Sequence, residues 1–285
     1  MAAGVGPTAG ARPPRAAIKR LRRRARRVKQ TVRRTRKNLL EGGFRRSLED
    51  PDVPLSIDMD SDSRTLLVAF GGMHRDMGMP PFEFFAVTRE IPSKRLFVRD
   101  LRRAWYHKGI EGHGETITAA ADSLRELIAQ HEVDRLITVG SSAGGYAALV
   151  FGALLGAEKA LSFGPQTVID PATIAAIGDH RWDGELAELQ AAGVLDANWT
   201  DLRYALPRAR SGETAETSYE IYFSHNNTRP NTGPGRDRAH AERLRGVEGV
   251  RLYRFGHGGH MIARSLRENG ALDKILRRAL LATPQ

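Results

Sequence analysis

The stretch "LITVGSSAGGYAALV", residues 136–150, places two adjacent serines between a β-branched run and an Ala/Leu-rich run. The first run is typical of a buried strand and the second of a helix. Between them, residues 140–144 match the pattern G-x-S-x-G, with Ser142 at the serine position. A strand that ends at Gly140, followed at once by a helix, is the context in which this pattern indicates an elbow that carries a nucleophile.

Glycines flank the candidate serine on both sides. The elbow turns so sharply that larger side chains two positions away would collide, and Gly140 and Gly144 avoid this. We expect Ser142 to lie in strained backbone at the carboxyl edge of a sheet, with a helix N-terminus behind it. Ser141 would be a bystander to the attack, and we assign it to substrate contact only. The alternative is a glycine-rich turn that binds a phosphate or nothing.

The rest of the chain alternates between strand-like and helix-like segments. Residues 171–210 are typical of short helices without a clear strand. This alternation predicts an α/β fold: a mostly parallel sheet with helices on both faces. The expected strands are 64–73, 94–100, 135–140, 159–165, 219–224 and 250–256, and the expected helices are 116–131, 143–156, 237–246 and 260–281.

A nucleophilic serine needs a general base, and the region after the last strand offers two histidines. "RFGHGGHM" (254–261) contains His257 and His260. We favour His260 because it directly precedes the final helix and follows a glycine pair that lets the loop reach Ser142.

The acid that orients the base is expected after the strand at 219–224. In residues 225–244, Asp237 is the carboxylate that precedes the body of the next helix, where it could equally act as an N-cap. Asn226 and Asn227 occupy the position just after the strand. Asp170, after the preceding strand, is the reserve candidate.

Two backbone N–H groups would stabilise the oxyanion that forms when the serine attacks. One is the N–H of Ala143, directly after the nucleophile. The second is expected from "AFGGM" (69–73), which ends a strand with two glycines, so that Gly72 or Met73 is the donor. An ordinary glycine turn is the alternative.

Composition narrows the classes of protein to consider. The chain has 285 residues and no cysteine, which excludes disulfides and thiolate chemistry. No window approaches the length of apolar sequence that spans a bilayer. The first residues have no apolar core of a secretory signal, so we expect a cytoplasmic protein. We expect no cofactor, because a dinucleotide fingerprint and metal-ligand spacing are both missing.

The net charge of +11 belongs to the N-terminal tail, because residues 1–50 contain 16 Lys/Arg and three acids. Between Arg15 and Leu40, apolar residues recur at helical spacing on one narrow stripe, and Arg and Lys occupy the other faces. Such a helix could lie at the inner face of an anionic membrane. The alternatives are a short coiled coil, a contact with nucleic acid, and a basic arm that is either solvated or docked on its own domain. Nucleic acid is the weakest, because no aromatic residues are interleaved. We expect a tail over 1–50 and an α/β domain over 54–281.

The order Ser142, Asp237, His260, with "FGG" upstream, resembles the α/β-hydrolase superfamily over about residues 54–281. Four stretches are similar to a bacterial subgroup found beside, or fused to, glycosyltransferases of surface-polysaccharide synthesis. In that subgroup a D-x-x-H-A pattern supplies the acid, which supports Asp237. The stretches are "VRDLRRAWYHKGI" (98–110), "TVGSSAGGYAALVFGALLGAEKALSFGPQT" (138–167), "DRAHAERL" (237–244) and "GHMIARSLRENGAL" (259–272).

Two aromatic residues follow the strand at 94–100. Trp105 and Tyr106 lie near the carboxyl edge, where ligands bind in open α/β sheets, so we expect them to contact substrate. Packing beneath the loop is the equal alternative. Residues 171–210 occupy the place of a lid, and with two short helices the lid would be small and the site open.

These features predict a serine hydrolase that acts on an ester through an acyl-enzyme. The resemblance suggests an O-acylated glycan or a small ester as substrate. An acyltransferase of the same fold is the near alternative. The alternative from another class is a non-catalytic hydrolase-fold module that binds a glycan or a glycosyltransferase partner.

Overall fold

The computed structural model describes residues 43–73, 82–210, 216–225 and 236–282. The chain divides into two units, residues 1–43 and residues 44–285, and the second contains the described fold. The helix and the membrane contact expected over residues 15–40 lie outside the described residues. Among the helices that the structure describes, none is both long enough and apolar enough to span a bilayer.

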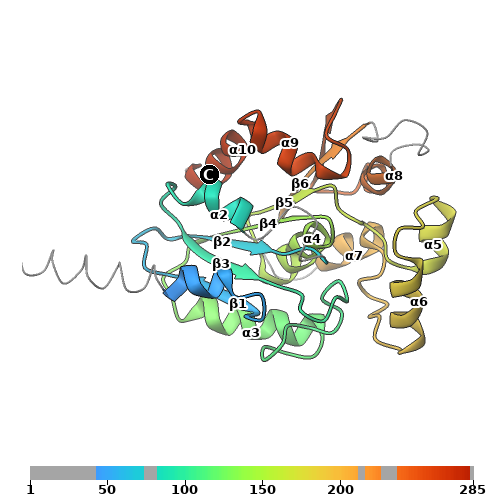
Figure 1. Ribbon diagram of the computed structural model, residues 1–285, viewed down its shortest axis with the longest axis horizontal. Coiled ribbons are helices and arrows are strands. Elements are labelled where there is room, and N and C mark those ends of the chain that lie inside the picture. The colour runs from blue at the N-terminus through green and yellow to red at the C-terminus, as the bar shows by residue number, and fades with distance from the viewer. Residues whose placement is uncertain (1–42, 74–81, 211–215, 226–235, 283–285) are drawn as a thin grey trace, which may run out of the picture. The chain divides into compact units, whose positions relative to one another are not determined.

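Seven strands form one sheet in the order β1-β3-β2-β4-β5-β6-β7 (Figure 1). Strand β1 is antiparallel to β3, and all other neighbours are parallel. The fold class predicted from the alternation of segments is therefore confirmed. The strands are β1 (Leu55–Asp58), β2 (Thr65–Phe70), β3 (Lys94–Val98), β4 (Arg135–Ser141), β5 (Lys159–Phe163), β6 (Ser218–Ser224) and β7 (Val250–Phe255).

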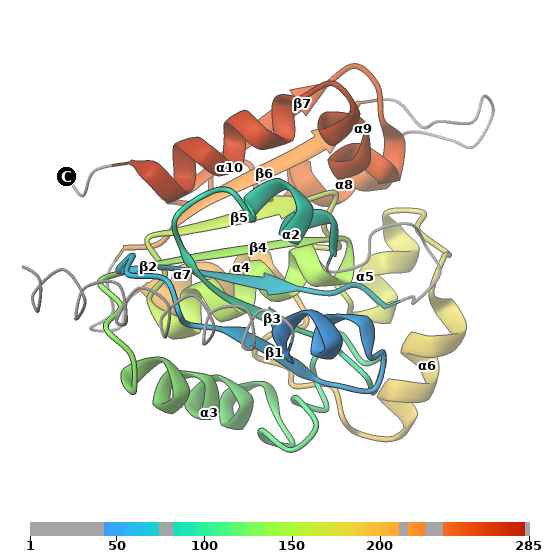
Figure 2. The ribbon, with the colours of Figure 1, turned by 60° about the vertical axis from the view of Figure 1, so that its left-hand side comes forward.

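Helices cover both faces of the sheet (Figure 2). On one face α3 and α4 pack against alternate residues of β2 such as Leu66 and Val68, and on the other α2, α9 and α10 pack near Leu67 and Ala69. The helices are α2 (Phe82–Thr88), α3 (Ile117–Ala129), α4 (Ala143–Leu155), α5 (Pro171–Ala176), α6 (Asp183–Ala191), α7 (Leu202–Arg210), α8 (Arg236–Arg243), the 3₁₀ turn η1 (Gly259–Met261), α9 (Ile262–Glu268) and α10 (Ala271–Leu281).

Burial on both faces explains why the central strands are continuous apolar runs rather than alternating ones. Every residue of β2, β3 and β4 is buried. Helix α4 is buried from Ala143 to Ala153, and it approaches the sheet closely at Gly152. A Cβ atom there would lie 2.9 Å from both the Cβ of Ala160 and the Oγ1 of Thr138. The helix that follows the serine elbow is thus buried and packed closely against the sheet.

Several boundaries differ from the sequence expectations. The final helix expected over 260–281 is interrupted, because Gly270 adopts φ +76° between α9 and α10. Where the structure describes it, at residues 164–210 and 216–217, the insertion between β5 and β6 contains three helices, α5, α6 and α7, rather than two. Strand β1 and helix α2 carry no strong periodic signal and were not predicted.

A buried chain of polar groups ties this insertion to α4. The backbone N–H of Asp196 donates to Nδ1 of His107 over 2.8 Å, so that Nε2 of the ring carries the proton and donates to the hydroxyl of Tyr146. That hydroxyl donates in turn to the carbonyl of Trp199 over 2.8 Å. Burial lowers the pKa of His107 from 6.5 to about 4 despite the nearby charge of Asp196, so the ring stays neutral.

We expect this histidine to make the fold acid-sensitive. Because the folded pKa lies below the unfolded one, the unfolded chain binds more protons between pH 6.5 and 4, and stability is lost as the pH falls through this window. The free energy of unfolding should fall by about 2 kcal/mol between pH 7 and pH 5. Urea titrations of His107→Gln, which keeps a donor and an acceptor but does not titrate, should show a flatter pH dependence. An equal slope in both proteins would contradict this assignment.

Candidate active site

Ser142 lies between the end of β4 and the start of α4 in a backbone conformation that non-glycine residues rarely adopt, φ +57° and ψ −123°. Such a conformation stores about 1–3 kcal/mol of strain and is characteristic of functional sites. Both flanking glycines are sterically required. A Cβ atom on Gly140 would lie 2.0 Å from the carbonyl oxygen of Gly144, and one on Gly144 would lie 2.2 Å from that of Phe70.

His260 lies in η1, after β7, and its Nε2 is 3.0 Å from Oγ of Ser142. The turn that brings it there depends on Gly258 and Gly259, whose φ angles of +111° and +53° are readily available only to glycine. The other candidate base, His257, is exposed.

Asp237 lies in the first turn of α8 and holds the other side of the His260 ring. Both of its carboxylate oxygens are 3.0 Å from Nδ1 of His260. A carboxylate at this distance requires a proton on Nδ1, which leaves the lone pair of Nε2 facing Ser142. Burial opposes the charge of Asp237, but the charge and hydrogen bond of His260 and the charge of Arg181 outweigh it and lower the pKa of this carboxyl. The reserve acid, Asp170, instead caps α5 by accepting from Thr173.

A guanidinium that the sequence did not single out touches both the candidate base and the candidate acid. Nη1 of Arg181, between α5 and α6, donates to Oδ1 of Asp237 over 3.1 Å and lies 3.1 Å from Nδ1 of His260. Its Nε and Nη2 donate to the carboxylate of Asp179, at 2.8 Å and 2.6 Å. A short irregular segment such as 177–182 has no periodic pattern, so no sequence signal marked these residues.

Asp179 is in turn held by His240, one helical turn after Asp237 on α8. The backbone N–H of Thr167 donates to Nδ1 of His240, so Nε2 carries the proton and donates to Asp179 over 3.1 Å. Burial lowers the pKa of His240 more than the carboxylate raises it. Burial opposes the charge of Asp179, but the hydrogen bonds from His240 and Arg181 lower its pKa well below the ordinary value. The D-x-x-H spacing of residues 237–240 is the one sequence signal of the pair formed by His240 and Asp179.

The loop after β2 packs directly against the elbow. A Cβ atom on Gly144 would lie 2.9 Å from the carbonyl carbon and oxygen of Gly71, and one on Gly72 would lie 3.5 Å from the carbonyl oxygen of Ser141. Ala143 begins α4, so its N–H is among the first of that helix. The expected oxyanion donors Ala143, Gly72 and Met73 therefore belong to two backbone segments in contact with each other.

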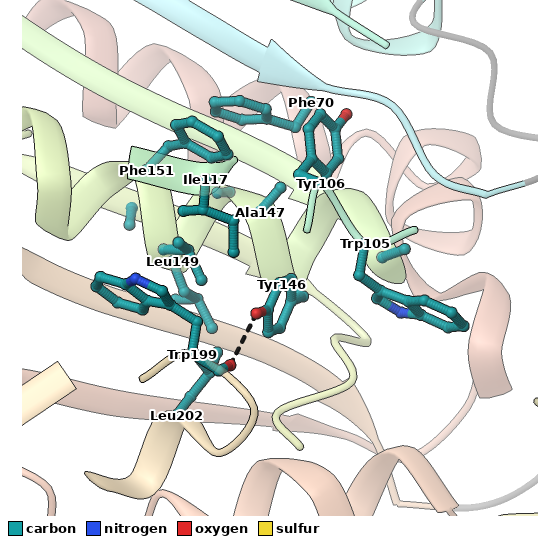
Figure 3. Close-up of a cluster of buried hydrophobic side chains, with 14 of the residues drawn as sticks. Phe70, Trp105, Tyr106, Ile117, Tyr146, Ala147, Leu149, Phe151, Trp199 and Leu202 are labelled. Carbon is teal, nitrogen blue, oxygen red and sulfur yellow. Dashed lines mark hydrogen bonds between the residues drawn. The ribbon is translucent and has the colours of Figure 1, made fainter. Parts of the chain in front are cut away.

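Trp105 and Tyr106 correct one of our expectations. Both side chains have no exposed surface and belong to the core, so they do not present a face to substrate (Figure 3). Trp105 donates from Nε1 to Gln166, and the hydroxyl of Tyr106 donates to the carbonyl of Gly71 over 2.9 Å. The polar atoms of both side chains form hydrogen bonds inside the protein. The structure therefore agrees with the alternative expectation, in which the two rings pack beneath the loop. Ser141 is also buried, at 9% exposure.

The loop that carries these two rings is strained and is held by a buried carboxylate. Trp105 and Tyr106 have φ angles of +48° and +64°. Oδ2 of Asp100 accepts the backbone N–H groups of Ala104 and Tyr106, at 2.8 Å and 2.9 Å. Burial raises the pKa of Asp100 more than these hydrogen bonds lower it.

Among the described residues, no group of three or more His, Asp or Glu side chains is arranged to hold a metal ion.

Solved structures with the same architecture include MPT51 (FbpC1) of Mycobacterium tuberculosis, at a TM-score of 0.54 and 12% identity, covering 80% of this chain and 93% of that one. A chain of the glycosylation-associated Gap123 complex of Streptococcus agalactiae is similar at a TM-score of 0.52 and 18% identity, covering 80% and 45%. A candidate esterase from Staphylococcus aureus is similar at 0.50 and 13%, covering 78% and 77%. This chain has the α/β-hydrolase fold. Neither a protein-family model nor a curated protein sequence matches it.

The contacts at Ser142 can be compared with the order of residues that is usual in the α/β-hydrolase fold. In this fold the nucleophile, acid and base follow one another along the chain as serine, carboxylate, histidine. Ser142, Asp237 and His260 occur in that order, in the segments that follow β4, β6 and β7. Sequence identities of 12–18% support a shared fold, but they do not assign the activity of these proteins to this chain.

Proposed function

We propose that this protein is a serine esterase that works through an acyl-enzyme. The observation that carries the proposal is the unbroken series of contacts from Oγ of Ser142 to Nε2 of His260, and from Nδ1 to the carboxylate of Asp237, each at 3.0 Å. Strain at the serine supports it, because such strain persists only where the surrounding structure enforces it.

The geometry suggests the following steps. Nε2 of His260 accepts the proton of Ser142 as Oγ attacks the acyl carbon, and the resulting imidazolium is stabilised by Asp237. The N–H groups of Ala143 and of Gly72 or Met73 donate to the oxyanion. His260 then returns its proton to the leaving alcohol. A water molecule, activated by the same histidine, releases the acid and restores the serine.

For the substrate we propose an ester of a glycan or of a small alcohol. The sequence resemblance to proteins of surface-polysaccharide synthesis supports the glycan, and so does the similarity to a chain of a glycosylation-associated complex. That same complex favours a second candidate function, a hydrolase-fold module that acts by binding a partner protein. The two candidates differ in one property, which is whether Ser142 is activated.

The deciding experiment is reaction of the purified full-length chain with a fluorophosphonate, followed by mass spectrometry of the peptides. We expect one adduct, on Ser142, and turnover of nitrophenyl esters or O-acetylated saccharides in a panel. Added alcohols that lower acid release without lowering ester consumption would identify an acyltransferase. No adduct under conditions that label a known esterase would reject the catalytic proposal in favour of the binding module.

The contact between Tyr106 and Gly71 predicts a further effect on turnover. In a trans peptide the N–H of Gly72 points opposite to the carbonyl of Gly71, so the hydroxyl that holds this carbonyl also orients the N–H. We expect Tyr106→Phe to lower kcat about 10-fold with little change in KM, and to weaken binding of a boronic acid transition-state analogue in parallel.

Tyr146→Phe is the matched control for this prediction. Tyr146 is also fully buried, and it donates to a backbone carbonyl, but that carbonyl belongs to Trp199 (Figure 3). Both variants should lose similar stability, about 1–3 kcal/mol. If kcat and inhibitor binding fell equally in the two variants, Tyr106 would have no specific link to the oxyanion loop.

A further inference from the structure

The carboxylate of Asp237, the proposed acid, contacts two groups. Both of its oxygens lie 3.0 Å from Nδ1 of His260, and Oδ1 also accepts a hydrogen bond from Nη1 of Arg181 over 3.1 Å. The torsion that turns an aspartate carboxylate about its Cβ–Cγ bond has broad minima, so a contact with a single nitrogen leaves the group free to rotate. The second contact, from Arg181, fixes its orientation.

Arg181 reaches this carboxylate as a side chain that is already held in place. Its Nε and Nη2 donate to Asp179 over 2.8 Å and 2.6 Å, and its backbone N–H donates to the same aspartate over 3.2 Å. Two hydrogen bonds from one guanidinium to one carboxylate set the plane of the guanidinium. The side chains of Arg181 and Asp179 are 20% and 1% exposed, so little water competes for these contacts. The donor to Asp237 is therefore oriented before the reaction begins.

Asp179 is itself anchored to the helix that carries the acid. The backbone N–H of Thr167 donates to Nδ1 of His240, and Nε2 of this histidine donates to Asp179 over 3.1 Å. His240 lies three residues after Asp237, on the same face of α8. The contacts thus form a closed ring that starts and ends on one helix. Its members are Asp237, Arg181, Asp179 and His240.

A second ion pair connects the same helix with the same insertion, but away from the acid. Nη2 of Arg243, the last residue of α8, donates to Asp201, which directly precedes α7. These two side chains are 17% and 16% exposed, close to the exposure of Arg181. In the described part of the chain, the side-chain hydrogen bonds of Asp237 and His260 involve neither of them. Attachment of the insertion to α8 therefore does not depend on Arg181 alone.

We propose that Arg181 is a positioning residue, which acts by holding the carboxylate of Asp237 toward Nδ1 of His260. Asp179 and His240 in turn hold Arg181. This inference rests on the proposed function, because the orientation of the acid affects turnover only if Asp237 serves the base.

Removal of the guanidinium should slow the chemical step and leave binding of the ester nearly unchanged. Arg181→Met keeps a long side chain without a donor, and it should lower kcat about 10- to 100-fold with little change in KM, because the acid loses its fixed orientation. Arg181→Lys should lie between the wild type and Arg181→Met, since one ammonium group cannot bind Asp179 bidentately and also reach Asp237. Asp179→Asn keeps an acceptor for His240 and should lose less activity than Arg181→Met.

A double variant separates this role from a general effect on the structure. Asp237→Ala has no carboxylate to orient, so Arg181→Met should cause no further loss of kcat in that background. Independent losses would multiply instead. Added guanidinium chloride should restore part of the activity of Arg181→Ala, whereas sodium chloride at the same concentration should not.

The experiment measures steady-state kinetics and the rate of fluorophosphonate labelling of Ser142 in the full-length variants, with folding checked by circular dichroism. Arg243→Met is the matched control, because it breaks the other ion pair between the insertion and α8. It should keep the kcat and the labelling rate of the wild type.

Loss of kcat in Arg181→Met but not in Arg243→Met, with no additional loss in the Asp237→Ala background, would support the proposal. Wild-type kinetics in Arg181→Met, equal losses in the two arginine variants, or multiplying losses in the double variant would overturn it. If Asp237→Ala does not fold, the rescue by guanidinium decides the question. Failure of the proposed function gives a different result, because the wild type itself would then show no adduct on Ser142, and this inference would fall with it.

Discussion

Ser142→Ala is expected to lower kcat for any ester that the wild type hydrolyses by roughly 10⁵- to 10⁶-fold, because the acyl-enzyme can no longer form. Binding of the ester should change little, since the hydroxyl is one small group in the site. The fluorophosphonate adduct should disappear as well. Activity is measured with purified protein against the best ester in the panel, and residual rates are compared with a mock purification.

The neighbouring serine provides the control for this result. Ser141 belongs to β4, whereas Ser142 alone adopts φ +57°. Ser141→Ala should therefore keep the adduct at position 142. Retention of turnover in Ser142→Ala would reject the mechanism outright.

Ser142→Gly separates function from stability at the same position. Glycine adopts positive φ without strain, so this variant should be inactive and yet more stable than Ser142→Ala by about 1 kcal/mol in urea unfolding. Equal stability of the two variants would show that the backbone of the elbow is not strained.

Asp237→Asn is expected to have the second largest effect, a loss of about 10³- to 10⁴-fold in kcat. An amide cannot balance the imidazolium, and its NH₂ group can donate to Nδ1 of His260 and hold the ring with the proton on Nε2. The positive Arg181, 3.1 Å from Nδ1, would then face the ring without the negative charge of the carboxylate that now contacts them both. Steady-state kinetics and the rate of fluorophosphonate labelling should fall together.

Asp170→Asn is the control for this loss, because it tests the other aspartate considered for the role of acid. Asp170 accepts from the backbone N–H of Thr173 at the start of α5, and asparagine caps helices as well as aspartate does. We expect nearly wild-type kinetics. A larger loss in Asp170→Asn than in Asp237→Asn would assign the acid differently.

Much of the fold depends on residues that are close together in the sequence, so it could be predicted from the sequence. The boundary between β4 and α4 follows from a β-branched run, a glycine-rich turn and an Ala/Leu-rich run, and the structure has it where we expected. Parallel strands end at one edge of a sheet, so residues that follow strands are expected to meet there. The structure brings Ser142, Asp237 and His260 together at that edge.

Features with weak periodicity could not be predicted. Strand β1 is four residues long, with two of them not buried, and α2 has seven residues. The break between α9 and α10 depends on the single residue Gly270, whose effect on a helical pattern is ambiguous until its φ angle is known.

The sequence alone determined the order of the six strands β2 to β7, the elbow at Ser142 and the candidates for base and acid, because short-range periodicity and steric demands act along the chain. Only the tertiary structure decided that Trp105 and Tyr106 are buried, and that Arg181 lies against Asp237, 56 residues away. Burial and electrostatic contact depend on which segments the sheet brings together. The charged side chains at His260 come from two separate segments, residues 177–182 and α8, which meet only once the chain is packed.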